Sequence, residues 1–287
     1  MGDSNMDIRT NSELFKTFDS IKLFEQSYSP EKDIKGIIIF MHGLNEHSGC
    51  YSKVSRKFSE HKYAVNLFDI RGHGKSDGPL AFIDSFEDTL NDLSVFLDIV
   101  RNRYPKKPVF LFGHGMGAIV SALYVIKNKP EIRGLILSAP ALNINQFISP
   151  SLQNICWILG RLFPRWPLIK MNSSDLSKDP KVVQDFENDP LVYHGKIYAR
   201  TCLEFINASK TVVNEGDEIK IPLLIVHGKE DRLFDFEGSR ALLEEVKVVD
   251  KTIHVYKELS HSLLLEPQGR KVLIDIIQWT DSHVRID

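Results

Sequence analysis

The chain has 287 residues, with 36 Lys and Arg against 38 Asp and Glu, and 43% of the residues are hydrophobic. This apolar fraction is too high for a disordered chain, and the balanced charge provides no basic field for binding nucleic acid. The three cysteines are widely spaced and form neither a disulfide framework nor a CxxC metal motif, so we expect a protein of the reducing cytoplasm.

The amino-terminal segment, residues 1–14, is polar and lacks the apolar centre of a secretory signal. A myristoylation signal would need Ser or Thr at the position that Met6 occupies. No apolar run approaches the length of a transmembrane helix. We therefore expect a flexible amino terminus ahead of a globular domain.

Apolar, strand-like runs then alternate with segments of helical period, a pattern typical of a parallel sheet covered by helices. It predicts an α/β fold with a mostly parallel central sheet and helices on both faces. The expected strands are a hairpin over 15–19 and 21–26, then 36–41, 64–68, 109–112, 135–137, 223–226 and 253–256; the expected helices are 52–60, 86–103, 116–127, 237–246 and 270–280.

The alternation stops between residues 142 and 220, where five prolines separate helical pieces and no strand-like run is evident. We interpret 142–220 as a single cap inserted into a core made of 15–141 and 221–287. One helix of this cap has a wide apolar surface. It is either an ordinary core helix or a lid that faces a lipid pocket on one side and a membrane on the other. The apolar residues at helical spacing are Leu152, Ile155, Leu159, Leu162 and Trp166, and Cys156, Trp157, Ile158 and Phe163 widen the surface.

The strand over 109–112 runs into a glycine-rich pentapeptide, residues 113–117 (GHGMG), and then into a helix. This is the form of a nucleophile elbow, G-x-S-x-G, in which a sharp turn lifts the central side chain above the sheet. The central residue here is Gly115, which offers no hydroxyl, thiol or carboxylate. A dinucleotide-binding loop is excluded, because its third glycine would stand at position 118, which is alanine.

Two further residues follow later strands of the expected sheet. Asp231 comes just after the strand 223–226, and His261 comes just after 253–256. Elbow, acid and histidine thus occur in the chain order that this type of fold uses for a catalytic triad. The loop after the strand 36–41 can offer a backbone N–H to an oxyanion, and the residue after the elbow can offer a second.

Taken together, these motifs resemble the monoglyceride lipase branch of the α/β-hydrolases, close to lysophospholipases. The resemblance implies the α/β-hydrolase fold, Asp231 and His261 as triad members, and the N–H groups of Leu44 and Met116 as the oxyanion hole. It also implies a serine at position 115. The segments that carry the resemblance are 42–49 (HGLNEHSG), 68–76 (FDIRGHGKS), 113–117, 228–233 (GKEDRL), the region around His261 and, in the cap, 189–192 (DPLV).

The resemblance implies a single-chain lipid ester as substrate, such as a monoacylglycerol or a lysophospholipid. We expect no metal, no organic cofactor and no nucleic acid partner, and we expect peripheral membrane contact through the cap if its apolar helix is a lid. The residues expected to contact substrate are Gly43, Asn45, His114, Ile155 and Leu159.

Gly115 leaves two explanations open. The chain is an ester hydrolase whose nucleophile has been lost, or it is a natural lipid-binding protein without turnover. Halide or epoxide chemistry on the same scaffold would need an aspartate at this position. The glycines around His73 are interpreted as a tight structural turn rather than a catalytic motif.

Overall fold

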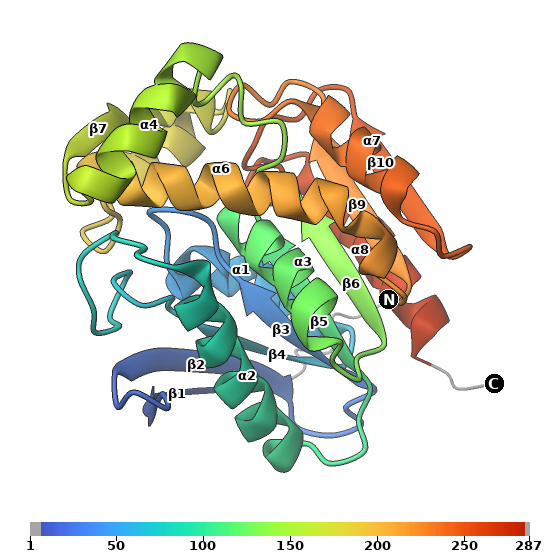
Figure 1. The fold of residues 1–287 in the computed structure, drawn as a ribbon. Helices are drawn as coiled ribbons and strands as arrows, with labels where there is room; N and C mark the ends of the chain where they lie inside the picture. Colours follow the sequence, from blue (N-terminus) through green and yellow to red (C-terminus); the bar gives the residue numbers. More distant parts are fainter. Residues whose placement is uncertain (1–6, 285–287) are drawn as a thin grey trace.

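The computed structural model describes residues 7–284, which form an eight-stranded sheet with a smaller cap above it (Figure 1). β1 and β2 are antiparallel to their neighbours, and the other strands run parallel. This confirms the predicted α/β class. In spatial order the strands are β1 (Ile8–Lys16), β2 (Lys22–Pro30), β4 (Tyr63–Phe68), β3 (Gly36–Met41), β5 (Val109–His114), β6 (Gly134–Ser138), β9 (Leu223–Gly228) and β10 (Lys251–Tyr256).

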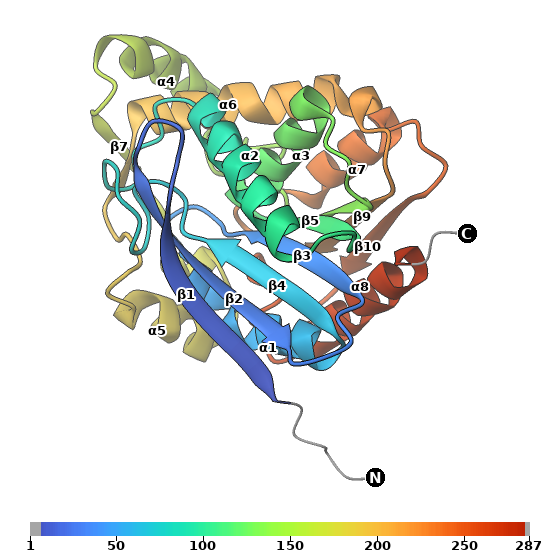
Figure 2. The ribbon, with the colours of Figure 1, turned by 90° about the horizontal axis from the view of Figure 1, so that it is seen from below.

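The five central strands are buried along their whole length, because helices cover both faces of the sheet. α2 (Phe86–Arg103), α3 (Met116–Asn128) and α7 (Phe236–Glu245) lie on one face, while α1 (Ser52–Glu60) and α8 (Gly269–His283) lie on the other (Figure 2). β10 is only half-buried, because it is the edge strand of the sheet.

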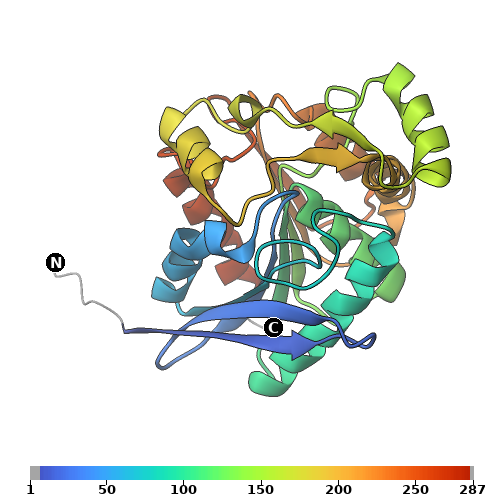
Figure 3. The same cartoon turned by 90° about the vertical axis from the view of Figure 1, so that its left-hand side faces the viewer.

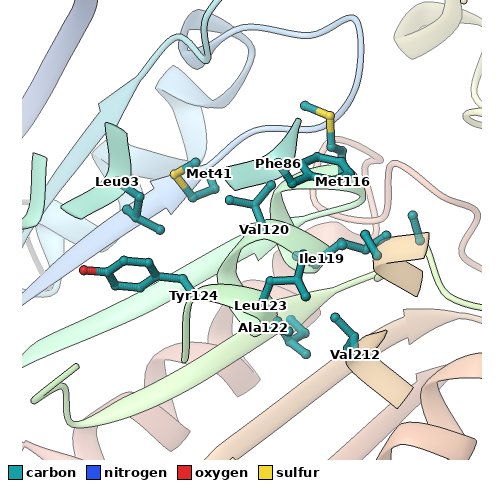
Figure 4. Packing of buried hydrophobic residues seen from close by; sticks show 14 of the residues in the cluster. Met41, Phe86, Leu93, Met116, Ile119, Val120, Ala122, Leu123, Tyr124 and Val212 are labelled. Atoms are coloured by element: carbon teal, nitrogen blue, oxygen red, sulfur yellow. The ribbon is translucent and has the colours of Figure 1, made fainter. Parts of the chain in front are cut away.

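α3 is the most enclosed of these helices, with every residue from Met116 to Ile126 buried. Figure 4 shows its side chains packed between Met41 of β3, Phe86 and Leu93 of α2, and Val212 of α6 (Ala199–Asn214). An apolar helix that is packed on all sides has little freedom to shift. The turn that leads into α3 is therefore held firmly.

The amino-terminal prediction is wrong for residues 8–14, which belong to β1. β1 pairs with β2 over nine residues, from Ile8 opposite Pro30 to Lys16 opposite Lys22. Of these nine side chains only Phe15 is buried, so an apolar pattern could not show an edge strand that is held by backbone hydrogen bonds. The remainder of that prediction, residues 1–6 with the myristoylation position, lies outside the described residues.

The cap lies between β6 and β9, at the opposite end of the molecule from the β1–β2 hairpin (Figure 3). Its two short strands are antiparallel, which corrects the expectation that this segment contains none; runs of three and four residues are too short to give a readable pattern. Within residues 7–284, no helix combines the length and the apolar content needed to cross a bilayer. The cap consists of α4 (Pro150–Leu162), β7 (Pro167–Lys170), α5 (Pro180–Asn188), β8 (Lys196–Tyr198) and α6 (Ala199–Asn214).

α4 contacts α6 along a narrow buried strip of its surface. Only Cys156 and Gly160 are buried in α4, and a Cβ atom on Gly160 would stand 2.9 Å from the carbonyl oxygen of Ala199. α4 is therefore not an ordinary core helix. Cys156 and Cys202 are free and buried, and neither borders the cavities described below, as expected for small apolar fillers.

Candidate active site

The elbow motif forms a sharp turn at the carboxyl end of β5. Gly115 has φ of +53° and ψ of −112°, a conformation that glycine adopts far more readily than other residues. A Cβ atom on Gly117 would overlap the carbonyl oxygen of Met41, and one on Gly113 would overlap the backbone of Gly117. The two flanking glycines thus allow β3, β5 and α3 to approach one another closely.

The structure brings the predicted acid and histidine together beside this turn. Nδ1 of His261 lies 2.8 Å from Oδ2 of Asp231, and both residues are buried. Nε2, the other ring nitrogen of His261, lies 3.2 Å from the position that a Cβ atom would take on Gly115. A serine Oγ one bond beyond that Cβ would be within hydrogen-bond reach of the ring.

Asp231 is held by more than its contact with His261. Its Oδ1 accepts hydrogen bonds from the backbone N–H groups of Leu233, at 2.8 Å, and Phe234, at 3.0 Å. Burial opposes ionisation, but the charge of His261 and the hydrogen bonds from His227 and His261 outweigh it, so the pKa of Asp231 lies below its ordinary value. The carboxylate is therefore ionised and fixed in orientation.

His227, which the sequence analysis did not identify, is the second histidine at this carboxylate. Its Nε2 lies 3.1 Å from both Oδ2 of Asp231 and the carbonyl oxygen of Phe234. Since both of these atoms are acceptors, Nε2 must carry a proton and donate it. In the neutral ring Nδ1 then accepts from the hydroxyl of Ser239 at 2.7 Å. The signal in the sequence was a histidine at the end of β9, four residues before the acid.

The electrostatics of His261 suit a general base. Burial alone would lower the pKa of His261, but the charge and hydrogen bond of Asp231, with a smaller contribution from Glu46, raise it above its ordinary value. The ring of His114 packs against that of His261 at an interplanar angle of 49°, with 4.7 Å between ring centroids, and its Nδ1 contacts the hydroxyl of Ser138 at 3.0 Å. Burial, together with the charge of His261, places the pKa of His114 well below its ordinary value, so His114 remains uncharged.

Two backbone N–H groups complete the site. Leu44 and Met116 border the same small cavity as His261, and among the described residues neither N–H has a hydrogen-bond acceptor. The neighbouring N–H of Gly43, by contrast, donates to Oε2 of Glu46 at 2.8 Å. Glu46 also accepts from the hydroxyl of Tyr51 at 2.7 Å, and burial raises the pKa of Glu46. These contacts fix the loop that carries Leu44.

The cavity beside His261 is small, about 20 Å³, and mostly apolar. Of the five expected substrate contacts it includes only Gly43; Asn45 and His114 are buried outside it, and Ile155 and Leu159 do not reach it. Ile155 and Leu159 lie away from the cavity because the side of α4 that faces α6 carries Cys156. This orientation leaves Ile155 on the exposed side of the helix. The apolar walls are Phe147, Met171, Leu176, Phe205, Leu233 and Phe234.

A second cavity of about 250 Å³ lies next to the first and shares Glu46 and Leu176 with it. Asp189 of the cap lines this cavity and contacts Nε2 of His47 at 2.9 Å. Nδ1 of His47 accepts from the N–H of Gly49, so Nε2 carries the proton that is donated to Asp189. This hydrogen bond ties the cap to the loop that follows β3.

His47 and Asp189, with Cys50, are also close enough together to suggest a metal site, their ligand atoms lying within 4.8 Å of one another. The arrangement does not favour a metal ion, because Nε2 of His47 is protonated in it. Burial also raises the pKa of the Cys50 thiol, which keeps the sulfur from the thiolate form that metals bind.

The 68–76 segment has the structural role that was predicted. The carboxylate of Asp69 accepts from the N–H groups of Ser48, at 2.7 Å, and Lys75, at 2.8 Å. Gly72 and Gly74 both have positive φ, and a Cβ atom on Gly74 would overlap the Asp69 carboxylate. This turn supports the loop after β3 from behind.

An α/β sheet with a nucleophile elbow, an acid and a histidine meeting at one edge defines the class of the serine hydrolases. The family model described as "Serine aminopeptidase, S33" matches residues 32–268. The chain belongs to this family of α/β-hydrolases, in its monoacylglycerol lipase-like branch.

Individual relatives agree with this placement. A monoacylglycerol lipase of Mycolicibacterium smegmatis is 31% identical, with 92% of this chain and 94% of the relative covered. A caffeoylshikimate esterase of Arabidopsis thaliana is also 31% identical, over 97% of this chain and 87% of the relative. The crystal structure of a monoacylglycerol lipase of Paleococcus ferrophilus is similar at a TM-score of 0.81 and 28% identity, covering 97% of this chain and all of that chain.

Proposed function

We propose that this chain carries the active site of a carboxylic-ester hydrolase for single-chain lipid esters, of the monoacylglycerol lipase or lysophospholipase type. In this proposal Asp231 and His261 are two members of a catalytic triad, and Gly115 occupies the nucleophile position, so that this form lacks acyl-transfer activity. The observation that carries it is the 3.2 Å between Nε2 of His261 and a Cβ atom on Gly115.

The mechanism of a serine-bearing form follows from the charges and donors of the site. His261, held in one tautomer by Asp231, accepts the proton of the serine hydroxyl as its oxygen attacks the ester carbonyl. The N–H groups of Leu44 and Met116 donate to the oxyanion. The imidazolium then protonates the leaving alcohol, and the same histidine activates the water that cleaves the acyl-enzyme.

The substrate class is supported by the walls of the site and by the relatives. Six apolar side chains surround the small cavity, which favours a hydrocarbon chain over a polar acyl group. Two of the similar proteins are named monoacylglycerol lipases. Since a cavity of about 20 Å³ cannot contain a lipid, side chains of the cap such as Met171 and Leu176 must move when substrate enters.

The outer surface of α4 supports contact between the cap and a lipid surface. Half or more of each of several large apolar side chains there is exposed, and Arg161 lies over the ring of Trp157 at 4.0 Å. Aromatic and aliphatic side chains flanked by arginine are typical of segments that lie in a membrane interface. The exposed residues are Trp157, Ile158 and Leu162 on α4, together with Phe163 and Trp166 just after its end.

The second candidate function is lipid binding without turnover, and Gly115 itself favours it. Replacing Gly115 with Ser separates the two. We expect the Gly115→Ser variant to hydrolyse monoacylglycerol or a p-nitrophenyl ester faster than the parent by up to about 10⁶-fold, as a triad nucleophile does on a different fold. Gly115→Ala is the matched control, because it adds the Cβ without the hydroxyl. A folded serine variant as inactive as the alanine variant would replace the enzyme proposal with the binding protein.

A further inference from the structure

Two backbone N–H groups and one imidazole nitrogen lie around the space beside Gly115. Leu44 and Met116 border the cavity, and neither N–H has an acceptor among the described residues. Nε2 of His261 faces the same space, since Nδ1 is occupied by Asp231 and the His261 side chain is 6% exposed. Once Nε2 is protonated, this set of three donors, enclosed by apolar walls, is suited to a small anionic group on a hydrocarbon chain.

The spacing of these donors follows from the reaction that the fold performs. In a tetrahedral intermediate the attacking oxygen and the oxyanion are bonded to one carbon atom, so their two binding positions lie one O–C–O angle apart. A carboxylate also has two oxygens on one carbon. When residue 115 is serine, its Oγ fills one of the two positions. When residue 115 is glycine, both positions are open to the oxygens of a ligand.

We propose that the Gly115 site binds the carboxylate of a free long-chain fatty acid. One oxygen accepts from the N–H groups of Leu44 and Met116, and the other accepts from protonated Nε2 of His261. The inference rests on the proposed function, because it uses the same oxyanion loop and the same acyl pocket. The ligand is the fatty acid that an ester hydrolase of this family releases as its product. This chain binds that acid without producing it.

The charges around the site are compatible with an anion. Protonated His261 pairs with Asp231, and the carboxylate becomes its second partner. Glu46 is the other acidic group that acts on His261; its Oε2 accepts hydrogen bonds from the N–H of Gly43 and the hydroxyl of Tyr51, and these two donors offset part of its charge.

The site is expected to bind a fatty acid more tightly than an uncharged alcohol or ester of the same chain length, because the head groups differ in charge. An alcohol or an ester of the same chain length can accept from the backbone N–H groups, but it forms no ionic hydrogen bond with His261. Charge-assisted hydrogen bonds are roughly twice as strong as neutral ones. A methyl group at position 115 would take the place of one carboxylate oxygen, since its carbon stands 3.2 Å from Nε2.

The test compares oleate with oleyl alcohol by isothermal titration calorimetry on the full chain and four variants. We expect the Kd for oleate to rise about tenfold or more in Gly115→Ala, Gly115→Ser and His261→Gln, and the Kd for oleyl alcohol to change far less. His254→Gln is the matched control, because His254 is a partly exposed histidine on β10 and away from the cavity. It should bind both ligands as the parent does.

Equal affinity of the parent chain for oleate and oleyl alcohol would overturn the inference, and so would oleate binding that is unaffected by both Gly115→Ala and His261→Gln. If one of these variants fails to fold, the other still decides. Hydrolysis by Gly115→Ser tests the proposed function separately. An active serine variant with no preference of the parent for oleate removes the inference alone, and an inactive serine variant with that preference intact removes the enzyme proposal alone.

Discussion

Gly117, in the first turn of α3, lies so close to Met41 at the end of β3 that no side chain fits between them. This approach brings the elbow after β5 next to the loop after β3, so that Leu44 and Met116 border one cavity. The two proposed oxyanion donors come from segments more than 70 residues apart in the sequence, and their spacing depends on this contact.

Replacing Gly117 with Ala tests that dependence. The added methyl would overlap backbone atoms of Met41 and His42, so a strand or a helix must shift. We expect a loss of roughly 3 kcal/mol or more in the free energy of unfolding, measured by urea denaturation. Gly115→Ala is the comparison; its Cβ meets nothing closer than 3.2 Å, and only its positive φ is strained. A smaller loss for Gly117→Ala than for Gly115→Ala would contradict this account of the packing.

The pH profile of the Gly115→Ser variant reports on His261. Because His261 must be neutral to accept a proton, and because its pKa is raised above 6.5, kcat/KM should increase with pH through a midpoint above 6.5. Asp231 has a lowered pKa and stays ionised throughout this range. Glu46→Gln removes a charge that raises the pKa of His261, so it should move the midpoint down. A midpoint that lies below 6.5 in the Gly115→Ser variant would refute the assigned electrostatics.

His227 is expected to act as a positioning residue for Asp231. In the Gly115→Ser background, His227→Leu removes a hydrogen bond to a buried carboxylate, which costs about 1–3 kcal/mol of stability. Without this donor Asp231 interacts more strongly with His261, so the pH midpoint of kcat/KM should rise. His227→Gln can retain an N–H donor and should resemble the parent in both respects. Equal midpoints in all three proteins would show that His227 serves packing alone.

The exposed apolar surface of α4 and of the residues just after it should bind lipid. We expect the double replacement Trp157→Ser and Phe163→Ser to weaken binding to phosphatidylcholine liposomes in a flotation assay while the thermal midpoint hardly changes, because these side chains are 51% and 56% exposed. Val249→Ser is the control, as it removes an exposed apolar residue outside the cap. A large drop in the thermal midpoint with unaltered liposome binding would show that the two aromatic residues stabilise the fold instead.

Buried elements were predictable from the sequence and exposed ones were not. The core strands and helices were found because burial on both faces requires long apolar runs, and α1 and α2 begin and end where predicted. β1 has a polar surface and β7 and β8 are short, so neither gives a periodic signal.

Some features of the candidate site could also be predicted from the sequence, and others could not. Asp231 and His261 could be placed together because both follow parallel strands, whose carboxyl ends meet at one edge of the sheet. The role of His227 could not be predicted, since it depends on which acceptors surround Nε2 in the folded chain. Ile155 was misplaced because helical spacing identifies an apolar face but does not show what that face contacts.

The positive φ at Gly115 affects how many destabilising substitutions the fold can tolerate elsewhere. A serine there would hold roughly 1–3 kcal/mol of backbone strain, which glycine avoids. Natural proteins are only marginally stable, so a reserve of that size is enough to offset one typical destabilising substitution elsewhere. A chain with glycine at this turn can therefore accommodate changes in its cap and pocket that a chain with a strained residue there would have to compensate.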